Sequence, residues 1–312
     1  MKIMNKIGAS VIITVLAVTT LCGCKDITIP GKTMSSFNSN QFHGGSYNYD
    51  ELTNSVIGGG EVASSGIDTL NVDWVAGQID LTYDDIDVIK IEETGKINND
   101  DEKLRYAVNG NKLNIWYCKS GISTAITSLG GKSLKVTVPN NIEFENITVD
   151  TVSAPLYFSD IEAGSFDFDG VSGGIEGNNL KVAKDIDIDT VSGTVKLNGE
   201  CDAENILFDT TSGDFEVKDL SANGKFSMDS VSGSIKANLM NSFDMELNST
   251  SGSMNITIPK DGSFKVNLDS VSGDVELDMK AQIKGETYII GDGEHMIEAD
   301  TVSGGINISE AN

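Results

Sequence analysis

The stretch Asp189-Thr190-Val191-Ser192-Gly193 reads DTVSG, and close variants of it recur along most of the chain. They include DTTSG at 209–213, DSVSG at 229–233 and 269–273, and DTVSG at 300–304. The motif serines are Ser153, Ser172, Ser192, Ser212, Ser232, Ser251, Ser272 and Ser303. Apart from the last interval, which holds an insertion, they recur about every 20 residues. A fixed period of this length predicts a repeat architecture in which stacked units share one core.

The residues on either side of the motif follow two strand patterns that are out of phase. Counted from the motif serine, apolar residues stand at −6 and −4, as in Ile186 and Ile188, and again at +3 and +5, as in Val195 and Leu197. Each run has the period of two that a strand with one buried face requires. Position −4 is even and position +3 is odd, so on one straight strand the two apolar runs would face opposite sides. The chain must therefore bend between the runs for both to face one core. The motif is therefore predicted to form a corner between two strands.

We expect each corner residue to have a structural role. The glycine would supply a backbone conformation that other residues avoid, and the aspartate and serine would accept hydrogen bonds from N–H groups left unpaired by the bend. The residue before the serine, such as Val191 or Val231, would point back into the core. The residues assigned to this turn motif are Asp189, Ser192, Gly193, Asp209, Ser212, Gly213, Asp229, Ser232, Gly233, Asp269, Ser272 and Gly273.

The predicted fold is all-β, a single-stranded β-solenoid or β-helix-like stack of about 20-residue repeats. The alternative is a meander of antiparallel hairpins with a similar period. The stack is favoured because equivalent positions carry equivalent residues along the whole array. The final GGINISEAN segment, residues 304–312, is expected to cap the open end of the stack only modestly.

Stacking would place Asp169, Asp189, Asp209, Asp229 and Asp269 in a ladder interrupted by Asn248. Carboxylates at strand spacing repel one another unless water or a cation screens them, so Asp189, Asp209 and Asp229 are a candidate calcium ladder. The favoured interpretation is that each carboxylate caps its own turn and faces water, with no bound metal.

The overall charge restricts the partners of the chain. Its 312 residues carry a formal net charge of −25, and Arg105 is an isolated arginine among lysines. Binding to nucleic acid phosphates is therefore excluded, since it requires basic surface. Glycine is abundant at 33 residues and the aromatic share is only 6%, which is typical of a turn-rich β protein.

The N-terminus resembles an export signal followed by a lipid attachment site. Lys2 and Lys6 precede the apolar segment 7–21, which is short for a membrane span, and Leu21-Cys22-Gly23-Cys24 resembles a bacterial lipobox. We expect residues 1–23 to be a lipoprotein signal peptide and Cys24 to carry the lipid; an ordinary secretory signal is the alternative. Residues 24–65 are polar and are expected to form a flexible tether. Its aromatic residues Phe37, Phe42, Tyr47 and Tyr49 could contact a partner, but an unstructured spacer is the favoured interpretation. The folded domain is expected over 66–312, with regular repeats from about 145.

Few residues suggest catalysis. A Ser-His-Asp arrangement would have to use His43 or His295, and there is no GxSxG or HExxH motif. A β-helical carbohydrate-active enzyme with a lysine base remains the alternative, and an acidic cluster around one lysine or histidine would favour it. Cys118 and Cys201 have no CxxC spacing; each is expected to be a small, partly buried side chain, and their pairing stays open. We expect no catalytic residues and no cofactor.

The strands VIKIEE, LRYAVNGNKLNIWY and SLKVTVPNNIEFENITVDTVSA, followed by tandem DTVSGTVKL-like units, resemble the bacterial DUF4097 family over roughly residues 66–312. Members are provisionally labelled adhesins. The resemblance implies a β-solenoid-like domain exposed at the cell envelope, with no catalytic residues to carry over. Some relatives are linked to envelope-stress responses, which offers a second function.

Together these features predict an acidic, membrane-anchored lipoprotein on the outer side of the membrane, with an adhesive or structural role. Its expected partners are membrane lipid through Cys24 and a glycan or envelope protein. The alternatives are an envelope-stress sensing or regulatory protein and a carbohydrate-active enzyme.

Overall fold

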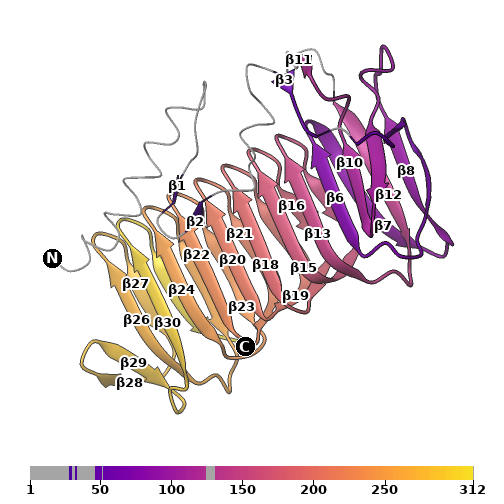
Figure 1. The fold of residues 1–312 in the computed structure, drawn as a ribbon. Helices are drawn as coiled ribbons and strands as arrows, with labels where there is room; N and C mark the ends of the chain where they lie inside the picture. The colour runs from indigo at the N-terminus through magenta and orange to yellow at the C-terminus, as the bar shows by residue number, and fades with distance from the viewer. Residues whose placement is uncertain (1–27, 30–31, 34–45, 51, 124–130, 312) are drawn as a thin grey trace.

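A computed structural model describes residues 28–29, 32–33, 46–50, 52–123 and 131–311, and these form strands, turns and loops (Figure 1). No helix among the described residues is long and apolar enough to cross a bilayer. The predicted signal peptide, Cys24, Phe37 and Phe42 lie outside the described residues. The all-β prediction is confirmed.

The repeats stack as parallel coils, and each coil contributes one strand to each of two long faces. We call the face before the corner motif face A. In spatial order its strands are β4 (Val56–Ile57), β9 (Arg105–Asn109), β10 (Lys112–Trp116), β6 (Thr69–Trp74), β13 (Phe144–Thr151), β15 (Asp160–Gly170), β18 (Asp185–Thr190), β20 (Asn205–Thr210), β22 (Lys225–Ser230), β24 (Asp244–Ser249), β30 (His295–Thr301), β26 (Phe264–Ser270), β29 (Thr287–Ile290) and β28 (Gln282–Lys284).

The face after the motif is called face B. In spatial order its strands are β5 (Gly60–Ala63), β8 (Val88–Thr94), β12 (Lys132–Pro139), β7 (Gly77–Asp84), β14 (Leu156–Phe158), β16 (Ile175–Gly177), β19 (Val195–Ala203), β21 (Phe215–Ala222), β23 (Ile235–Leu239), β25 (Met254–Ile258), β31 (Ile306–Glu310) and β27 (Val275–Asp278). Strands of successive repeats pair in parallel on both faces, so the meander alternative is wrong. Antiparallel pairs occur at the two ends of the stack, in β4, β5, β8, β9, β10 and β12 and in the hairpin β28–β29.

A third, shorter face closes the middle coils. It joins the start of β15 to β17 (Asn179–Val182) and to the ends of β19, β21 and β23. Its core ladder consists of Ile161, Leu180, Cys201, Leu220 and Leu239, all at most 4% exposed. Cys201 therefore occupies an aliphatic position of the repeat. Cys201 and Cys118 are both buried and unbridged.

The coils do not follow one another in chain order. The chain passes from β24 and β25 to β26 and β27, and then returns so that β30 lies between β24 and β26, and β31 between β25 and β27. The expectation that residues 304–312 cap the stack is therefore wrong, because β31 is an interior strand. The terminal coil is formed by β26 and β27, and the hairpin β28–β29 covers β26 (Figure 1).

The folded body begins earlier than the predicted boundary at residue 66. Within the segment expected to be a tether, β4 pairs with β9, β5 pairs with β8, and β3 (Ser46–Tyr47) pairs with β11 (Ile122–Ser123). Tyr47 is fully buried, and the Tyr49 ring stacks on Trp116 at 4.6 Å between centroids. Both tyrosines pack on the body because each buries a large apolar ring there. Two further short strands, β1 (Thr28–Ile29) and β2 (Lys32–Thr33), pair with each other.

Candidate functional site

The corner motif differs from the prediction in which residue points inward. In the DTVSG corner, Thr190 and Gly193 are buried, while Val191 is half-buried and Ser192 is exposed. At the terminal coil the equivalent Val271 is 63% exposed. The inward positions are thus −6, −4 and −2, then +1, +3 and +5. The bend places two consecutive residues, −1 and the serine, on the outside, so the valine does not return to the core.

The residue that caps the corner is the one between the aspartate and the valine. Its hydroxyl accepts the N–H of the motif glycine, as Thr190 does from Gly193 at 2.8 Å and Thr210 from Gly213 at 2.7 Å. The same bond recurs at Ser230, Ser249, Ser270 and Thr301. A buried N–H must find a partner when a strand turns, and this hydroxyl is the nearest acceptor. A Thr or Ser at −2 in nearly every copy was the sequence signal for this role.

The motif serine instead links neighbouring coils. The Ser192 hydroxyl donates to the Val171 carbonyl at 3.3 Å, and its backbone N–H donates to the same oxygen at 2.9 Å. Ser212, Ser232, Ser251, Ser272 and Ser303 repeat the hydroxyl bond.

The motif glycines are required by close approach rather than by an unusual backbone angle. The motif glycines at 193, 213, 233 and 273 adopt negative φ, which any residue can take. A Cβ added at Gly193 would lie 1.8 Å from the Gly173 carbonyl oxygen, and one at Gly213 would lie 1.9 Å from that of Gly193. Each glycine therefore lets the neighbouring coil pack at strand spacing.

The motif aspartates form a ladder that extends farther than expected. In spatial order, its members pair in register as Asp73, Asp150, Asp169, Asp189, Asp209, Asp229, Asn248, Asp300 and Asp269. All but Asn248 are aspartates, and they alternate with the core residues of face A. Asp73, Asp169 and Asp209 are nevertheless at most 9% exposed, while Asp189, Asp229 and Asp269 are half-buried. The sequence interpretation missed Asp73, Asp150 and Asp300, because β6, β13 and β30 are placed in the ladder only by the fold.

Crowding of like charges alters the acidity of this ladder. Burial, and after it the neighbouring carboxylates of Asp73, Asp169 and Asp167, together raise the pKa of Asp150 to about 8. Burial also raises the pKa of Asp229, although Asn248 donates to its carboxylate at 3.0 Å. Among the described residues no three His, Cys, Asp or Glu side chains gather as a metal-binding group.

The outer side of face B shows the opposite arrangement. Its ladder runs through Lys135, Asp80, Tyr157, Glu176, Lys196, Glu216, Lys236, Asn255, Asn307 and Glu276. Opposite charges alternate along its middle, and Lys236 pairs with Glu216 at 2.9 Å. Such exposed pairs contribute only about 0–1 kcal/mol each, but they avoid the repulsion of a like-charged ladder. Face B therefore shows that this fold does not by itself require the acidic ladder of face A.

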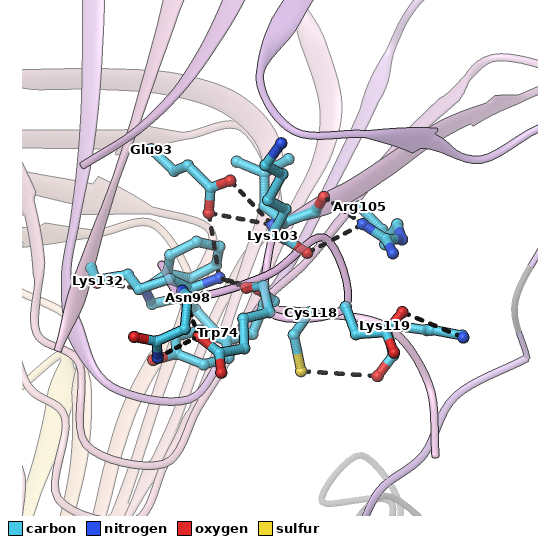
Figure 2. A network of polar contacts seen from close by, with 12 residues as sticks. Trp74, Glu93, Asn98, Lys103, Arg105, Cys118, Lys119 and Lys132 are labelled. Carbon is cyan, nitrogen blue, oxygen red and sulfur yellow. Dashed lines mark hydrogen bonds and ion pairs between the residues drawn. The ribbon is translucent and has the colours of Figure 1, made fainter. Parts of the chain in front are cut away.

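A buried lysine lies at the end of the stack formed by β7, β8 and β12. Figure 2 shows the Lys132 ammonium beside the Glu93 carboxylate, and the two are 3.1 Å apart with both side chains at most 6% exposed. The ammonium also donates to the carbonyls of Glu102 and Tyr117, and lies 4.2 Å from the Tyr117 ring centroid. These partners match the three donors of an ammonium group.

This lysine is arranged for structure rather than for proton transfer. Burial lowers the pKa of Lys132, and Glu93 opposes that shift. Glu93 in turn accepts the Leu104 N–H with both oxygens, at 3.1 and 3.0 Å. The pair ties β8, β12 and the 102–104 segment together, as expected of a buried ion pair with every group satisfied.

The remaining catalytic candidates do not assemble. The His295 ring lies 3.7 Å from the Asp244 carboxylate, with both side chains more than one third exposed. Within the described ranges, no hydrogen bond joins the His295 ring to a serine hydroxyl. His43 lies outside the described residues.

The fold and its ladders define a parallel β-solenoid with uniform long faces. The chain belongs to the DUF4097 family, described as Toastrack, whose model matches residues 67–309. No curated protein matches the chain. Two solved structures do. One, provisionally described as a cell adhesion protein from Clostridium sporogenes, is 15% identical, with 82% of this chain and 99% of that chain covered at a TM-score of 0.27. The other, provisionally described as an adhesin from Bacteroides fragilis, is 15% identical, with 82% and 98% covered at a TM-score of 0.47.

Proposed function

We propose that this protein is a non-enzymatic binding rod of the cell envelope, an adhesin-type protein held to the membrane by lipid on Cys24. The observation that carries the proposal is the in-register repetition of polar side chains along both long faces, above all the aspartate ladder of face A. A surface of this kind gains strength from many weak contacts with a repetitive partner, such as an envelope glycan or protein.

The acidic ladder supports a partner that carries positive charge. Face B alternates its charges, whereas face A keeps aspartates at neighbouring positions despite their repulsion. Opposite charge on the partner would be attracted to the half-buried members of this ladder, such as Asp229 and Asp269. The exposed Lys236 and His295 each pair with one carboxylate, of Glu216 and Asp244, rather than with the acidic cluster expected around the base of a carbohydrate-active enzyme.

Binding is tested with the full chain in lipid vesicles, mixed with intact envelopes of the producing cell and sedimented. Replacing Asp229 and Asp269, two half-buried members of the ladder, together by Asn should reduce retention and its salt dependence. The matched control is Glu216→Gln with Lys236→Gln, which removes an ion pair from face B at no net charge change. Equal retention by both variants would argue against binding through face A.

Two further experiments test the remaining parts of the proposal. Cys24→Ala should move the protein from the membrane to the soluble fraction, and continued membrane retention would exclude the lipid anchor. Purified protein should leave envelope glycans intact. Glycan cleavage that disappears when one acidic residue is replaced would establish an enzyme instead.

A further inference from the structure

At the terminal coil of the stack, the edge strand of face A is paired with a further strand, whereas the edge strand of face B has no second partner among the described strands. On face A the hairpin strand β29 covers β26, with Phe264 opposite Ile290 and Val266 opposite Tyr288. On face B the last strand, β27, pairs with β31 alone among the described strands. Since the C-terminal strand β31 lies inside the stack, it does not cover this edge.

The hydrogen bonds of face B show which groups the edge leaves available. In each coil the first strand residue of face B donates its N–H to the next coil: Val195 to Asp214, Phe215 to Ser234, Ile235 to Ser253, Met254 to Gly305, and Ile306 to Asp274. Val275 occupies the same position in the terminal coil. Its N–H is therefore directed to the place where another coil would begin.

The core is likewise left incomplete at this edge. Val275 and Leu277 continue the ladder of Ile306 and Ile308, which are at most 1% exposed, yet Val275 is 39% exposed. Val271 at the corner and Ile283 on β28 are 63% and 70% exposed. One further strand with apolar residues at alternate positions would bury the exposed part of this ladder.

Charge selects the kind of strand that fits. The outward residues of the edge are Asp274, Glu276 and Asp278, which alternate with Val275 and Leu277. A second copy of β27 would bring these carboxylates side by side with their equivalents, which is unfavourable. In the middle of face B, by contrast, Glu176 and Glu216 each lie beside a lysine of the adjoining strand. By the same pairing, a lysine or arginine on the added strand would be favoured beside Glu276.

We propose that the β27 edge is a strand-addition site for an extended peptide segment of a partner protein, in which apolar residues alternate with lysine or arginine. The partner strand accepts the Val275 N–H, covers Val275 and Leu277, and places its cations beside Glu276 and its acidic neighbours. This site is separate from the acidic ladder of face A. An experiment that contradicts one of the two proposed binding sites therefore leaves the other untouched.

The test uses the full chain in detergent and a fluorescently labelled peptide of alternating lysine and valine, with an alternating glutamate and valine peptide as comparison. Fluorescence anisotropy should show binding of the lysine peptide only. Val275→Pro removes the edge N–H without touching an internal bond, and should weaken that binding about tenfold or more. Glu276→Lys should reverse the preference between the two peptides.

The control is Glu176→Lys, the same charge change on the same face in an interior coil, which should leave peptide binding unchanged. Circular dichroism should show unchanged folding of Val275→Pro. Equal binding by wild type and Val275→Pro would overturn the proposal, as would equal loss in Glu176→Lys. Light scattering that shows dimers lost in Val275→Pro, without peptide binding, would assign the edge to a second copy instead.

Discussion

At each corner of the stack, a glycine lies against the carbonyl oxygen of the glycine in the neighbouring coil. From Gly193 through Gly273 in spatial order, a Cβ added to the corner glycine would lie only 1.8–2.0 Å from that oxygen, which leaves no room for a side chain. Backbone carbonyls cannot move aside as a flexible side chain can, because they belong to the strand pairs. The corner glycine therefore sets how closely two coils approach.

The adjacent residues Gly304 and Gly305 allow the effect of close approach to be distinguished from the general effect of replacing a glycine. A Cβ at Gly304 would lie 2.0 Å from the Gly252 oxygen, whereas one at Gly305 would lie 3.6 Å from the Asp274 oxygen. Gly304→Ala should lower the free energy of unfolding by about 1–3 kcal/mol, the usual cost of overpacking. Gly305→Ala should change it by less than about 0.5 kcal/mol. Urea denaturation of both variants measures this; equal losses would contradict the close-approach explanation.

The two hydroxyls of one corner should differ in importance. Thr210 accepts the buried Gly213 N–H, so Thr210→Val leaves that donor without its acceptor and should cost about 1–3 kcal/mol of stability. Ser212→Ala removes only an exposed donor, since the Val191 oxygen keeps the Ser212 N–H, and should cost less than about 0.5 kcal/mol. Thermal or urea unfolding decides the order. A larger loss of unfolding free energy for Ser212→Ala than for Thr210→Val would show that the serine, as first predicted, caps the corner.

At the scale of the strand, face A and face B show two ways of arranging charge on parallel neighbours. Strand pairing places identical repeat positions side by side, so a repeated aspartate meets its own kind in every coil. Face B avoids this by alternating Glu and Lys between coils. On face A, burial and then the neighbouring carboxylates raise the pKa of Asp150, so that this residue keeps its proton.

The raised pKa of Asp150 predicts a pH-dependent stability. An unfolded aspartate releases its proton near pH 4, while the folded Asp150 holds it to about pH 8. Between these values the folded state binds more protons, so the stability contributed by Asp150 is present at acid pH and is lost as the pH rises. Asp150→Asn should therefore exceed wild type in stability at pH 8, by roughly 1 kcal/mol or more.

The measurement is urea denaturation of wild type and Asp150→Asn at pH 5 and pH 8. The stability difference should shrink at pH 5, where Asp150 is already neutral in the folded state. Asp261→Asn, in an exposed turn, serves as the control and should show no such trend. A pH-independent difference for Asp150→Asn would contradict the assignment.

At the scale of the whole molecule, the order of the coils is the least expected feature. The coil of β30 and β31 separates two coils that are consecutive in the chain. The result is that an internal segment, rather than the C-terminus, forms the end of the stack. This is also what leaves β27 as an edge.

Engineered disulfides test that order directly. Asn255 pairs in register with Asn307 on face B, so cysteines at these two positions lie at strand spacing, about 4.8 Å, and should cross-link on mild oxidation. Cysteines at 255 and 276 are one strand farther apart and should not. Burial raises the pKa values of Cys118 and Cys201 to about 12, so these thiols should stay unreactive. Mass spectrometry of the linked peptides identifies which pair of cysteines has formed a disulfide. Preferential linkage of 255 to 276 would show that the coils stack in the order of the chain.

The sequence by itself determined the coil: its period, its two out-of-phase strands, its corner and the buried apolar positions around it. These are local properties, because alternation along a strand and the place of a bend depend on residues next to one another in the chain. What only the tertiary structure decided depends on contacts between coils. Whether Thr190 or Ser192 caps the corner follows from which hydroxyl faces inward, and the need for Gly193 follows from a carbonyl in another coil. The ladder members Asp150 and Asp300, and the open edge at β27, follow from the order of stacking, which equivalent repeats leave undetermined because each coil can pack against any other.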